Sequence, residues 1–326
     1  MRRRDFIKAA GGLALAWSEA RAQDRIRRVG VLINYASDDP LAKAHLENFR
    51  RRLLQLGWTE GRNIQLDIRY GDSNPDLYQH RAKELIASKP EVIFAFTTPV
   101  VAALKRETRT IPIVFINVSD PIGSGFIASM ARPGGNITGI MLYESGIVGK
   151  WLAMLKEIAP QLVRAALMAN PKTLPFDYYV RSAEATAPSL GIEVVPSPVA
   201  GPADIEPSIR SFARVPNGGL VILASATLSA HQDLVVRLAA RHRLPAVYAQ
   251  PSYVTAGGLM SYSTDIIGLS RQAASYVDRI LHGAKPGDLP VQAPTKYETR
   301  LNLKTAKALG LSVPSSLLVR ADNVIE

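Results

Sequence analysis

Short apolar runs rich in β-branched residues recur along the chain. In the first half they are VGVLIN (29–34), IQLDIRY (64–70), VIFAF (92–96) and IPIVFIN (111–117). In the second half they are VRAALMA (163–169), IEVVPSPV (192–199), LVILA (220–224) and PAVYA (245–249). Runs of this length and composition are typical of buried strands. The pattern therefore predicts two successive sets of four strands.

Amphipathic segments separate these runs. After the first run, Leu46, Phe49, Leu53 and Leu56 lie on one stripe with the 3.6-residue period of a helix packed on a sheet, and the helix is expected to end at Gly57. In the second half, helices are expected near residues 177–190, 204–214 and 231–243. Strands that alternate with helices form parallel sheets covered on both faces. The predicted fold class is α/β, with two Rossmann-like lobes.

The N-terminus has the features of an export signal. Three arginines precede a short apolar stretch, and the small-x-small sequence ending at Ala22 is typical of a cleavage site. Arg3-Arg4-Asp5-Phe6-Ile7-Lys8 resembles the twin-arginine export motif. We therefore expect residues 1–22 to be a signal peptide cleaved near Ala22, the alternative being an ordinary basic N-terminus.

Composition removes several classes of function. The chain has no cysteine, which excludes disulfides, thiolate metal sites and a lipidated cysteine anchor. Its formal net charge is +11, but the Lys and Arg residues are scattered over expected helix faces. Nucleic-acid binders gather such charges into a stripe, tail or arginine-aromatic array. We therefore expect no nucleic-acid partner.

Four polar residues precede prolines shortly after expected strands, in Asp39-Pro40, Thr98-Pro99, Asp120-Pro121 and Asn170-Pro171. Each pair suits the start of a helix, where the polar side chain caps a backbone N–H and proline needs none. Loops after parallel strands also lie at the sheet edge where α/β folds bind ligands. Capped helices and a ligand cleft are both compatible with these pairs.

The sequence lacks the motifs of common catalytic and cofactor sites. The loop VSDPIGSG (118–125) has no lysine after its glycines and does not match a nucleotide-phosphate motif. The five histidines show no metal-site spacing, and there is no G-x-S-x-G nucleophile motif. We expect no enzyme activity, no cofactor and no metal.

Several segments carry a family resemblance. GWTEGRN, SDPIGSGF, ARPGGNITG and KTAKALGL, together with the surrounding sequence, resemble the ABC-transporter substrate-binding family that includes tryptophan- and tyrosine-binding proteins. The resemblance covers nearly the whole chain after the signal. It implies a type I periplasmic binding protein, in which a hinge of several chain crossings joins two lobes and the ligand lies between them.

The resemblance also implies how the chain is divided. Lobe 1 is expected to comprise residues 23–140 plus 263–290, and lobe 2 residues 141–262 plus 291–326. The expected crossings are ARPGGNITGI (131–140), GGLMSYSTD (257–265) and the proline-rich segment 286–295, and a helix with Leu269, Ala273, Tyr276, Val277 and Ile280 would pack on lobe 1. Glycines 134, 135, 257 and 258 either flex at the hinge or form ordinary turns.

The ligand-binding candidates are polar and aromatic residues at strand ends. They are Asn34, Tyr35, Thr97, Thr98, Ser119 and Asp120 in lobe 1, and Asn170, Ser225, Thr227, Gln250 and Tyr253 in lobe 2. Asp120 is either the partner of a ligand ammonium or a cap. Tyr35, Tyr253 and Tyr262 either stack on an apolar ligand or fill the core.

The function expected from the resemblance is periplasmic capture of a small molecule by hinge closure. The solute would be an amino acid of the aromatic class or a related carboxylate, and the partners would be ABC permease subunits of the inner membrane. The protein is expected to be a monomer. Two other readings stay open: a periplasmic sensory domain that reports to a receptor, and an enzyme on a Rossmann-like scaffold.

Overall fold

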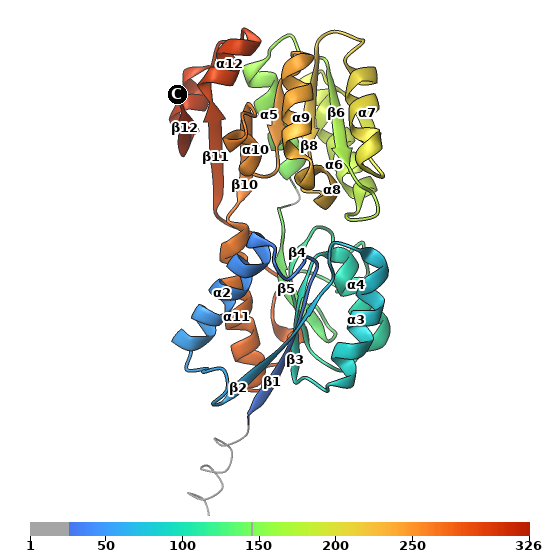
Figure 1. The fold of residues 1–326 in the computed structure, drawn as a ribbon, viewed down its shortest axis with the longest axis vertical. Coiled ribbons are helices and arrows are strands. Elements are labelled where there is room, and N and C mark those ends of the chain that lie inside the picture. The colour runs from blue at the N-terminus through green and yellow to red at the C-terminus, as the bar shows by residue number, and fades with distance from the viewer. Residues whose placement is uncertain (1–25, 145) are drawn as a thin grey trace, which may run out of the picture.

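The chain forms two α/β lobes, one above the other in Figure 1, in a computed structural model that describes residues 26–144 and 146–326. The predicted export signal lies outside the described residues. None of the helices in these two ranges is long and apolar enough to cross a membrane. Each lobe is built on its own sheet, and we name the lobes by these sheets.

Lobe 1 contains a five-stranded parallel sheet in the order β2-β1-β3-β4-β5. Its strands are β1 (Arg27–Ile33), β2 (Ile64–Tyr70), β3 (Val92–Phe96), β4 (Ile113–Val118) and β5 (Ile137–Met141). Its helices are α2 (Pro40–Gln55), α3 (Pro75–Ala87), α4 (Thr98–Glu107) and α11 (Ile266–Leu281).

The two faces of this sheet are covered by different helix pairs. α2 and α11 pack on one face, where the stripe of Leu46, Phe49 and Leu53 is buried as predicted. α3 and α4 cover the other face. Asp39 caps α2 by accepting a hydrogen bond from the backbone N–H of Leu41 at 2.7 Å. The helix ends where Gly57 adopts a left-handed conformation, also as predicted.

Lobe 2 contains a seven-stranded sheet in the order β12-β11-β10-β9-β8-β6-β7. Its strands are β6 (Arg164–Ala169), β7 (Glu193–Pro198), β8 (Gly218–Ile222), β9 (Ala246–Tyr248), β10 (Met260–Thr264), β11 (Tyr297–Asn302) and β12 (Asn323–Ile325). β10 and β11 are antiparallel, and the other pairs are parallel. The α/β class with two lobes is confirmed, although the second sheet is not purely parallel.

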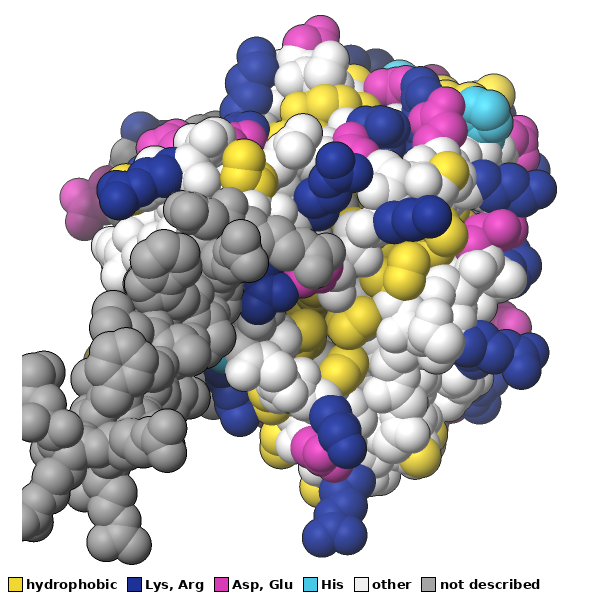
Figure 2. All heavy atoms as spheres, turned by 90° about the horizontal axis from the view of Figure 1, so that it is seen from below, with side chains coloured by type: hydrophobic (Ala, Val, Ile, Leu, Met, Phe, Trp, Pro, Cys, Tyr) yellow, Lys and Arg dark blue, Asp and Glu magenta, His cyan; other side chains and the backbone are white. Residues whose placement is uncertain are grey.

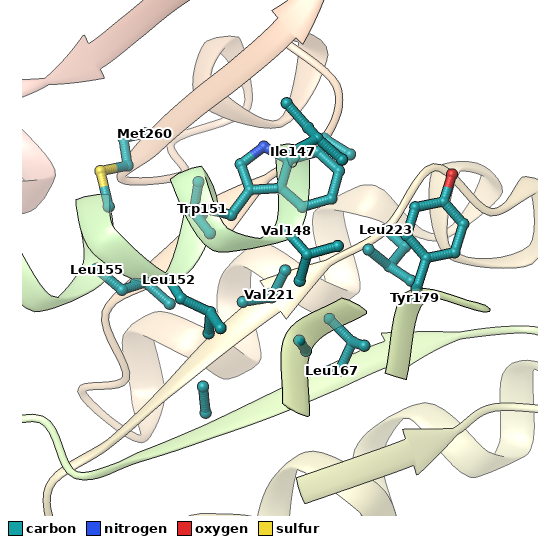
Figure 3. Close-up of a cluster of buried hydrophobic side chains, with 14 of the residues drawn as sticks. Ile147, Val148, Trp151, Leu152, Leu155, Leu167, Tyr179, Val221, Leu223 and Met260 are labelled. Atoms are coloured by element: carbon teal, nitrogen blue, oxygen red, sulfur yellow. The ribbon is translucent and has the colours of Figure 1, made fainter. Parts of the chain in front are cut away.

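Helices also cover both faces of the second sheet. They are α5 (Ile147–Ile158), α6 (Phe176–Thr186), α7 (Ile205–Phe212), α8 (Ala226–Ala230), α9 (Gln232–Arg241), α10 (Ser252–Thr255), α12 (Leu303–Leu309) and α13 (Ser315–Arg320). Single 3-10 turns lie at η1 (Ala187–Leu190), η2 (Pro202–Asp204) and η3 (Pro286–Asp288). Figure 3 shows Ile147, Val148, Trp151, Leu152 and Leu155 of α5 packed over the strands of this sheet.

Three chain segments connect the lobes and are hydrogen-bonded to one another. The backbone N–H of Met141 donates to the carbonyl of Gln292 at 2.8 Å. The hydroxyl of Thr264 donates to the carbonyl of Leu142 at 3.4 Å, and the backbone N–H of Glu144 donates to the Tyr297 hydroxyl at 2.8 Å. These hydrogen bonds therefore join the three crossings into one bundle.

Two expectations about these crossings are corrected. Residues 137–141 form β5, which pairs with β4, so the chain leaves lobe 1 after Met141 rather than within 131–140. Gly134 and Gly135 precede β5, and Gly257 and Gly258 precede β10, so all four lie at the amino edges of their sheets, away from the crossings. Their role in the structure is to form turns.

Charged side chains are dispersed over the lower end of lobe 1. Seen from below, Lys and Arg alternate with Asp and Glu, and hydrophobic side chains lie between them (Figure 2). On this face the positive charges are spread rather than gathered into a stripe.

Candidate functional site

The carboxyl ends of the two sheets face each other. β4 of lobe 1 is followed directly by Ser119, and β6 of lobe 2 leads into α6, which carries Tyr179. The Tyr179 hydroxyl donates a hydrogen bond to the Ser119 hydroxyl at 2.8 Å, and both residues are buried. Beside them, burial and the Asp120 carboxylate raise the pKa of the Tyr178 phenol, which places a second tyrosine of α6 near lobe 1. The lobes thus touch at the edge where α/β folds bind ligands.

Three polar residues lie side by side at the carboxyl edge of the lobe 1 sheet. The register pairs Leu32 with Ala95 and Phe96 with Ile116. Continuing both pairings to the strand ends sets Asn34, Thr97 and Asn117 side by side on β1, β3 and β4. Asn34 and Asn117 are both buried. Polar side chains buried at a ligand-binding edge form a candidate recognition surface.

The backbone at this edge is unusual. Thr97 has φ 67° and Asn117 has φ 58°, both in the left-handed region. Asparagine tolerates that region, whereas a β-branched threonine there is an outlier held by its surroundings. Thr97 is also the N-cap of α4, but no side-chain oxygen caps this helix. The N-terminal N–H groups of α4 are therefore not occupied by a cap.

The neighbouring candidates Thr98 and Asp120 make local contacts. The backbone N–H of Ser119 donates to the Thr98 hydroxyl at 3.4 Å. Asp120 accepts a hydrogen bond from the N–H of Gly123 at 2.8 Å within a turn, not at a helix start. Thr98 is the first residue of α4 rather than its cap. Of the four polar-proline pairs, only Asp39-Pro40 forms the expected capped helix.

In lobe 2, Asn170 brings two other candidates together. Its side-chain amide donates to the Thr227 hydroxyl at 2.8 Å and to the Ala200 carbonyl at 3.1 Å. Its backbone N–H donates to the Ser225 hydroxyl at 3.2 Å, and its side-chain oxygen accepts from the N–H of Lys172 at 2.9 Å. Asn170, Ser225 and Thr227 form one satisfied network at the carboxyl edge of lobe 2.

The last two lobe 2 candidates, Gln250 and Tyr253, both lie near Ser229 of α8. The Ser229 hydroxyl donates to the side-chain oxygen of Gln250 at 2.5 Å, just after β9. Tyr253 is almost fully buried and its ring stacks on Tyr248, with centroids 4.7 Å apart and an angle of 14° between planes. Tyr253 belongs to the hydrophobic core formed with α7 and α9. Its ring fills the core, which was one of its two expected roles.

Tyr35 lies next to a buried histidine. Its ring stacks on His45 of α2, with centroids 6.2 Å apart, and burial raises the pKa of Tyr35 to about 12. His45 Nδ1 is 2.7 Å from the Ser270 hydroxyl of α11. Burial lowers the pKa of His45 to about 4, against a smaller opposing effect of Asp265. Both rings are therefore uncharged at neutral pH.

The described residues hold no ionised side chain that is fully buried. Every buried polar residue in these ranges is Asn, Ser, Thr or His. No group of three or more His, Cys, Asp or Glu residues in the described part of the chain is arranged to hold a metal ion. The fully buried polar groups at the facing edges are neutral hydrogen-bonding groups, and Asp120 is the charged candidate beside them.

Sequence reasoning missed Asn117, Tyr179 and His45. Asn117 was read as the end of a strand, although a lone asparagine closing the run IPIVFIN is a signal that could have been followed. Tyr179 and His45 lie within helices, and nothing in a helical pattern says which residue meets the other lobe. A hollow of about 770 Å³ lined by Lys105, Arg106 and Arg109 lies elsewhere, at the amino edge of lobe 1.

Comparisons with known proteins point to one family. The model of the family described as ABC transporter substrate binding protein matches residues 31–325. A tyrosine-binding protein of Clostridioides difficile (strain R20291) is 24% identical over 315 residues, covering 95% of this chain and 87% of that protein.

Solved structures share the fold. A conserved domain protein of Vibrio cholerae is 27% identical, with a TM-score of 0.84, and 92% of this chain and 100% of that chain are covered. An ABC domain from Streptococcus pneumonia in complex with L-Trp is 21% identical, with a TM-score of 0.83 and the same coverage. The fold is that of the type I periplasmic binding proteins.

Proposed function

Because the chain belongs to the ABC transporter substrate-binding protein family, we propose that it captures a small solute between its lobes and delivers it to the permease of an ABC importer. This is a family of solute-binding proteins rather than of enzymes. The observation that carries the proposal is the hydrogen bond between Ser119 and Tyr179, which joins the carboxyl edges of the two lobes. A ligand that contacts both edges would favour the same closed arrangement.

The proposed solute is an amino acid with an aromatic side chain. Support comes from the names of two relatives, the tyrosine-binding protein and the domain in complex with L-Trp. The uncharged polar groups at the facing edges suit such a molecule. The residues proposed to line the cleft are Asn34, Tyr35, Thr97, Thr98, Ser119 and Asp120 from lobe 1, and Asn170, Ser225, Thr227 and Gln250 from lobe 2.

Closure would occur by rotation about the bundle of crossings. We propose that the expected division, residues 23–140 plus 263–290 against 141–262 plus 291–326, describes the two moving bodies once the first two crossings are set after Met141, where β5 ends, and after Thr264, where β10 ends. The packing of α11 against α2 and of α12 with the lobe 2 core supports this division. The open and closed forms would differ by a hinge motion with little change inside either lobe.

The proposed location is the periplasm, after removal of residues 1–22. The arginine pair, the short apolar stretch and the cleavage sequence support export. The proposed partners are the solute and the permease subunits in the inner membrane, with the protein acting as a monomer.

Ligand binding is tested on the purified mature protein. Native mass spectrometry reports any bound solute, and thermal-shift measurements with amino acids, aromatic acids and sugars report binding. A ligand present at about 100 times its dissociation constant raises the free energy of unfolding by about 2.7 kcal/mol. We expect this shift with L-tyrosine or L-tryptophan. No bound mass and no shift with any member of the panel would contradict the proposal.

Import is tested in cells. A deletion strain should lose uptake of the radiolabelled solute, and the intact gene should restore it. Unchanged uptake, with binding retained in vitro, would indicate that the protein serves a receptor instead of a transporter.

A further inference from the structure

Two buried asparagines of lobe 1 each carry an oxygen that accepts no hydrogen bond. Asn34 is 7% exposed and Asn117 is 8% exposed. Within the described ranges, the side-chain oxygen of neither residue accepts a hydrogen bond. Buried amide oxygens are almost always bonded, because leaving one unpaired away from water is unfavourable. Two such oxygens at the ligand-binding edge therefore indicate a donor group supplied by a bound molecule.

The two asparagines flank the start of α4. The register sets Asn34 and Asn117 on either side of Thr97, the residue that precedes this helix. Two strand spacings separate them, roughly 10 Å at the backbone. One molecule the size of an amino acid can therefore contact both. α4 is ten residues long, and its N-terminus carries no side-chain cap and a partial positive charge. The two asparagine oxygens can accept hydrogen bonds from a donor group, and the N-terminus of α4 between them can bind an anion.

Charge limits what can bind there. Among the described residues no Asp, Glu, Lys or Arg is buried, so the cleft offers a ligand no buried countercharge; Asp120, which is partly exposed, accepts the N–H of Gly123 within a turn. Enclosing a ligand with a net charge would be costly without one. A molecule that carries both a cationic donor and an anionic acceptor has no net charge and can use both features.

We propose that lobe 1 recognises the two ends of an α-amino acid, with the side-chain oxygens of Asn34 and Asn117 holding the ammonium group and the N-terminus of α4 holding the carboxylate. This inference rests on the proposed function and adds the selectivity of the site. A ligand needs both its amine and its carboxylate to bind tightly. The ligand side chain then points toward lobe 2. Aromatic acids that lack the amine are poor ligands.

The inference is tested by isothermal titration of the full mature protein with matched probes. The probes are L-tyrosine and L-tryptophan, the two propanoates that lack the amine, and the two amines that lack the carboxylate. In the wild-type protein, the amino acid should bind at least 100-fold more tightly than its deaminated and decarboxylated forms.

Substitutions at the two asparagines assign the ammonium contact. Asn34→Ala and Asn117→Gly should weaken binding of the amino acid at least tenfold and leave the deaminated probe unchanged. Glycine is used at position 117 because it keeps the left-handed backbone without strain. Asn117→Asp keeps the oxygens and adds a charge, so the decarboxylated amine should gain at least tenfold relative to the amino acid.

The matched control is Asn217→Gly. Asn217 is also left-handed, with φ 59°, but it is exposed at the amino edge of lobe 2, so all probes should bind as in the wild type. Thermal unfolding of every variant without ligand checks its folding. Equal losses for the amino acid and the deaminated probe in the two asparagine variants would overturn the inference.

Two further outcomes separate a failure of this inference from a failure of the proposed function. If the deaminated probe binds the wild-type protein as tightly as the amino acid, the ammonium assignment is wrong while solute binding stands. If no probe binds the wild-type protein, this inference and the proposed amino-acid ligand both fail.

Discussion

Tyr179 joins the lobes through one hydroxyl group. Its ring belongs to the core of lobe 2, while its oxygen reaches Ser119 of lobe 1. A hydrogen bond of this kind contributes about 1 kcal/mol to the state that contains it. Because the bond exists only when the lobes meet, it stabilises the closed form and not either lobe alone.

Tyr179→Phe removes this bond and keeps the ring. We expect the dissociation constant of the amino-acid ligand to rise about five- to tenfold, corresponding to about 1 kcal/mol. Isothermal titration measures this directly. Tyr276→Phe is the control, because it removes a hydrogen bond to the Pro290 carbonyl at 2.6 Å that does not join the facing edges. If both variants bind the ligand like the wild type, the Tyr179 contact does not contribute to closure.

His45 makes stability depend on pH. Its pKa is lowered by burial to about 4, from 6.5 in the unfolded chain. Between these values the unfolded state binds a proton that the native state does not. Stability is therefore fully present above pH 6.5 and is lost as pH falls toward 4, by about 3 kcal/mol in total.

His45→Gln should flatten this dependence. Urea unfolding at pH values from 7 to 4 should show a slope smaller by about 1.4 kcal/mol per pH unit than in the wild type. An unchanged slope in His45→Gln would show that His45 takes up its proton in the native state as easily as in the unfolded chain.

At the residue scale the sequence identified part of the site. Asn34, Thr97 and Ser119 could be predicted because each directly follows an apolar strand, where parallel sheets expose polar groups. Asn117 closes its apolar run and could be suspected on the same ground, but the sequence does not report the left-handed backbone and the register shift between β4 and β5 that set its position. Tyr253 also follows a strand, but its ring stacks on Tyr248 in the core, which is one of its two expected roles.

At the scale of helices and strands, the sequence predicted those strands that an apolar run alone defines. The eight apolar runs all contain strands, with ends that differ by a few residues. β5, β10, β11 and β12 were not predicted as strands. β11 reads YETRLN, with polar residues at alternate positions, and it becomes a strand by pairing antiparallel to β10. That pairing joins residues distant in sequence, which periodicity does not report.

The β4–β5 pair depends on one glycine. Gly139 has φ 154°, and a Cβ atom there would lie 2.1 Å from the Phe115 carbonyl oxygen and 2.6 Å from its nitrogen. Both contacts are with backbone, so no side chain can move aside. Gly139→Ala should lower the free energy of unfolding by about 3 kcal/mol, measured by urea denaturation.

Gly135→Ala is the control in the same segment. A Cβ at Gly135 would meet no atom within 4 Å, so its effect should stay within about 0.5 kcal/mol. Equal unfolding free energies for the two variants would mean that β5 can move away from β4 at little cost.

At the scale of the whole molecule, the absence of cysteine makes closure measurable. Cysteines introduced at Arg62 and Arg214, exposed at the outer ends of the two lobes, would be the only labelling sites. With donor and acceptor dyes, adding L-tyrosine or L-tryptophan should raise the energy-transfer efficiency as the lobes rotate together.

A pair within lobe 1 controls for dye effects. Labels at Arg62 and at Asp76, also exposed, should give the same efficiency with and without ligand. If the inter-lobe pair does not respond although the ligand binds, the protein binds its solute without closing.

The position of α11 in the chain has a consequence for biosynthesis. Lobe 1 begins at β1, yet one of the two helices that cover one face of its sheet is complete only when residue 281 has been synthesised. Until then the face formed by Val29, Val31 and Phe94 lacks part of its cover. Lobe 2 is completed later still, by Leu301, Ala306 and Leu317. Lobe 1 therefore cannot finish its core until most of lobe 2 has been synthesised, so a chain interrupted between β6 and α11 leaves apolar sheet exposed in both lobes.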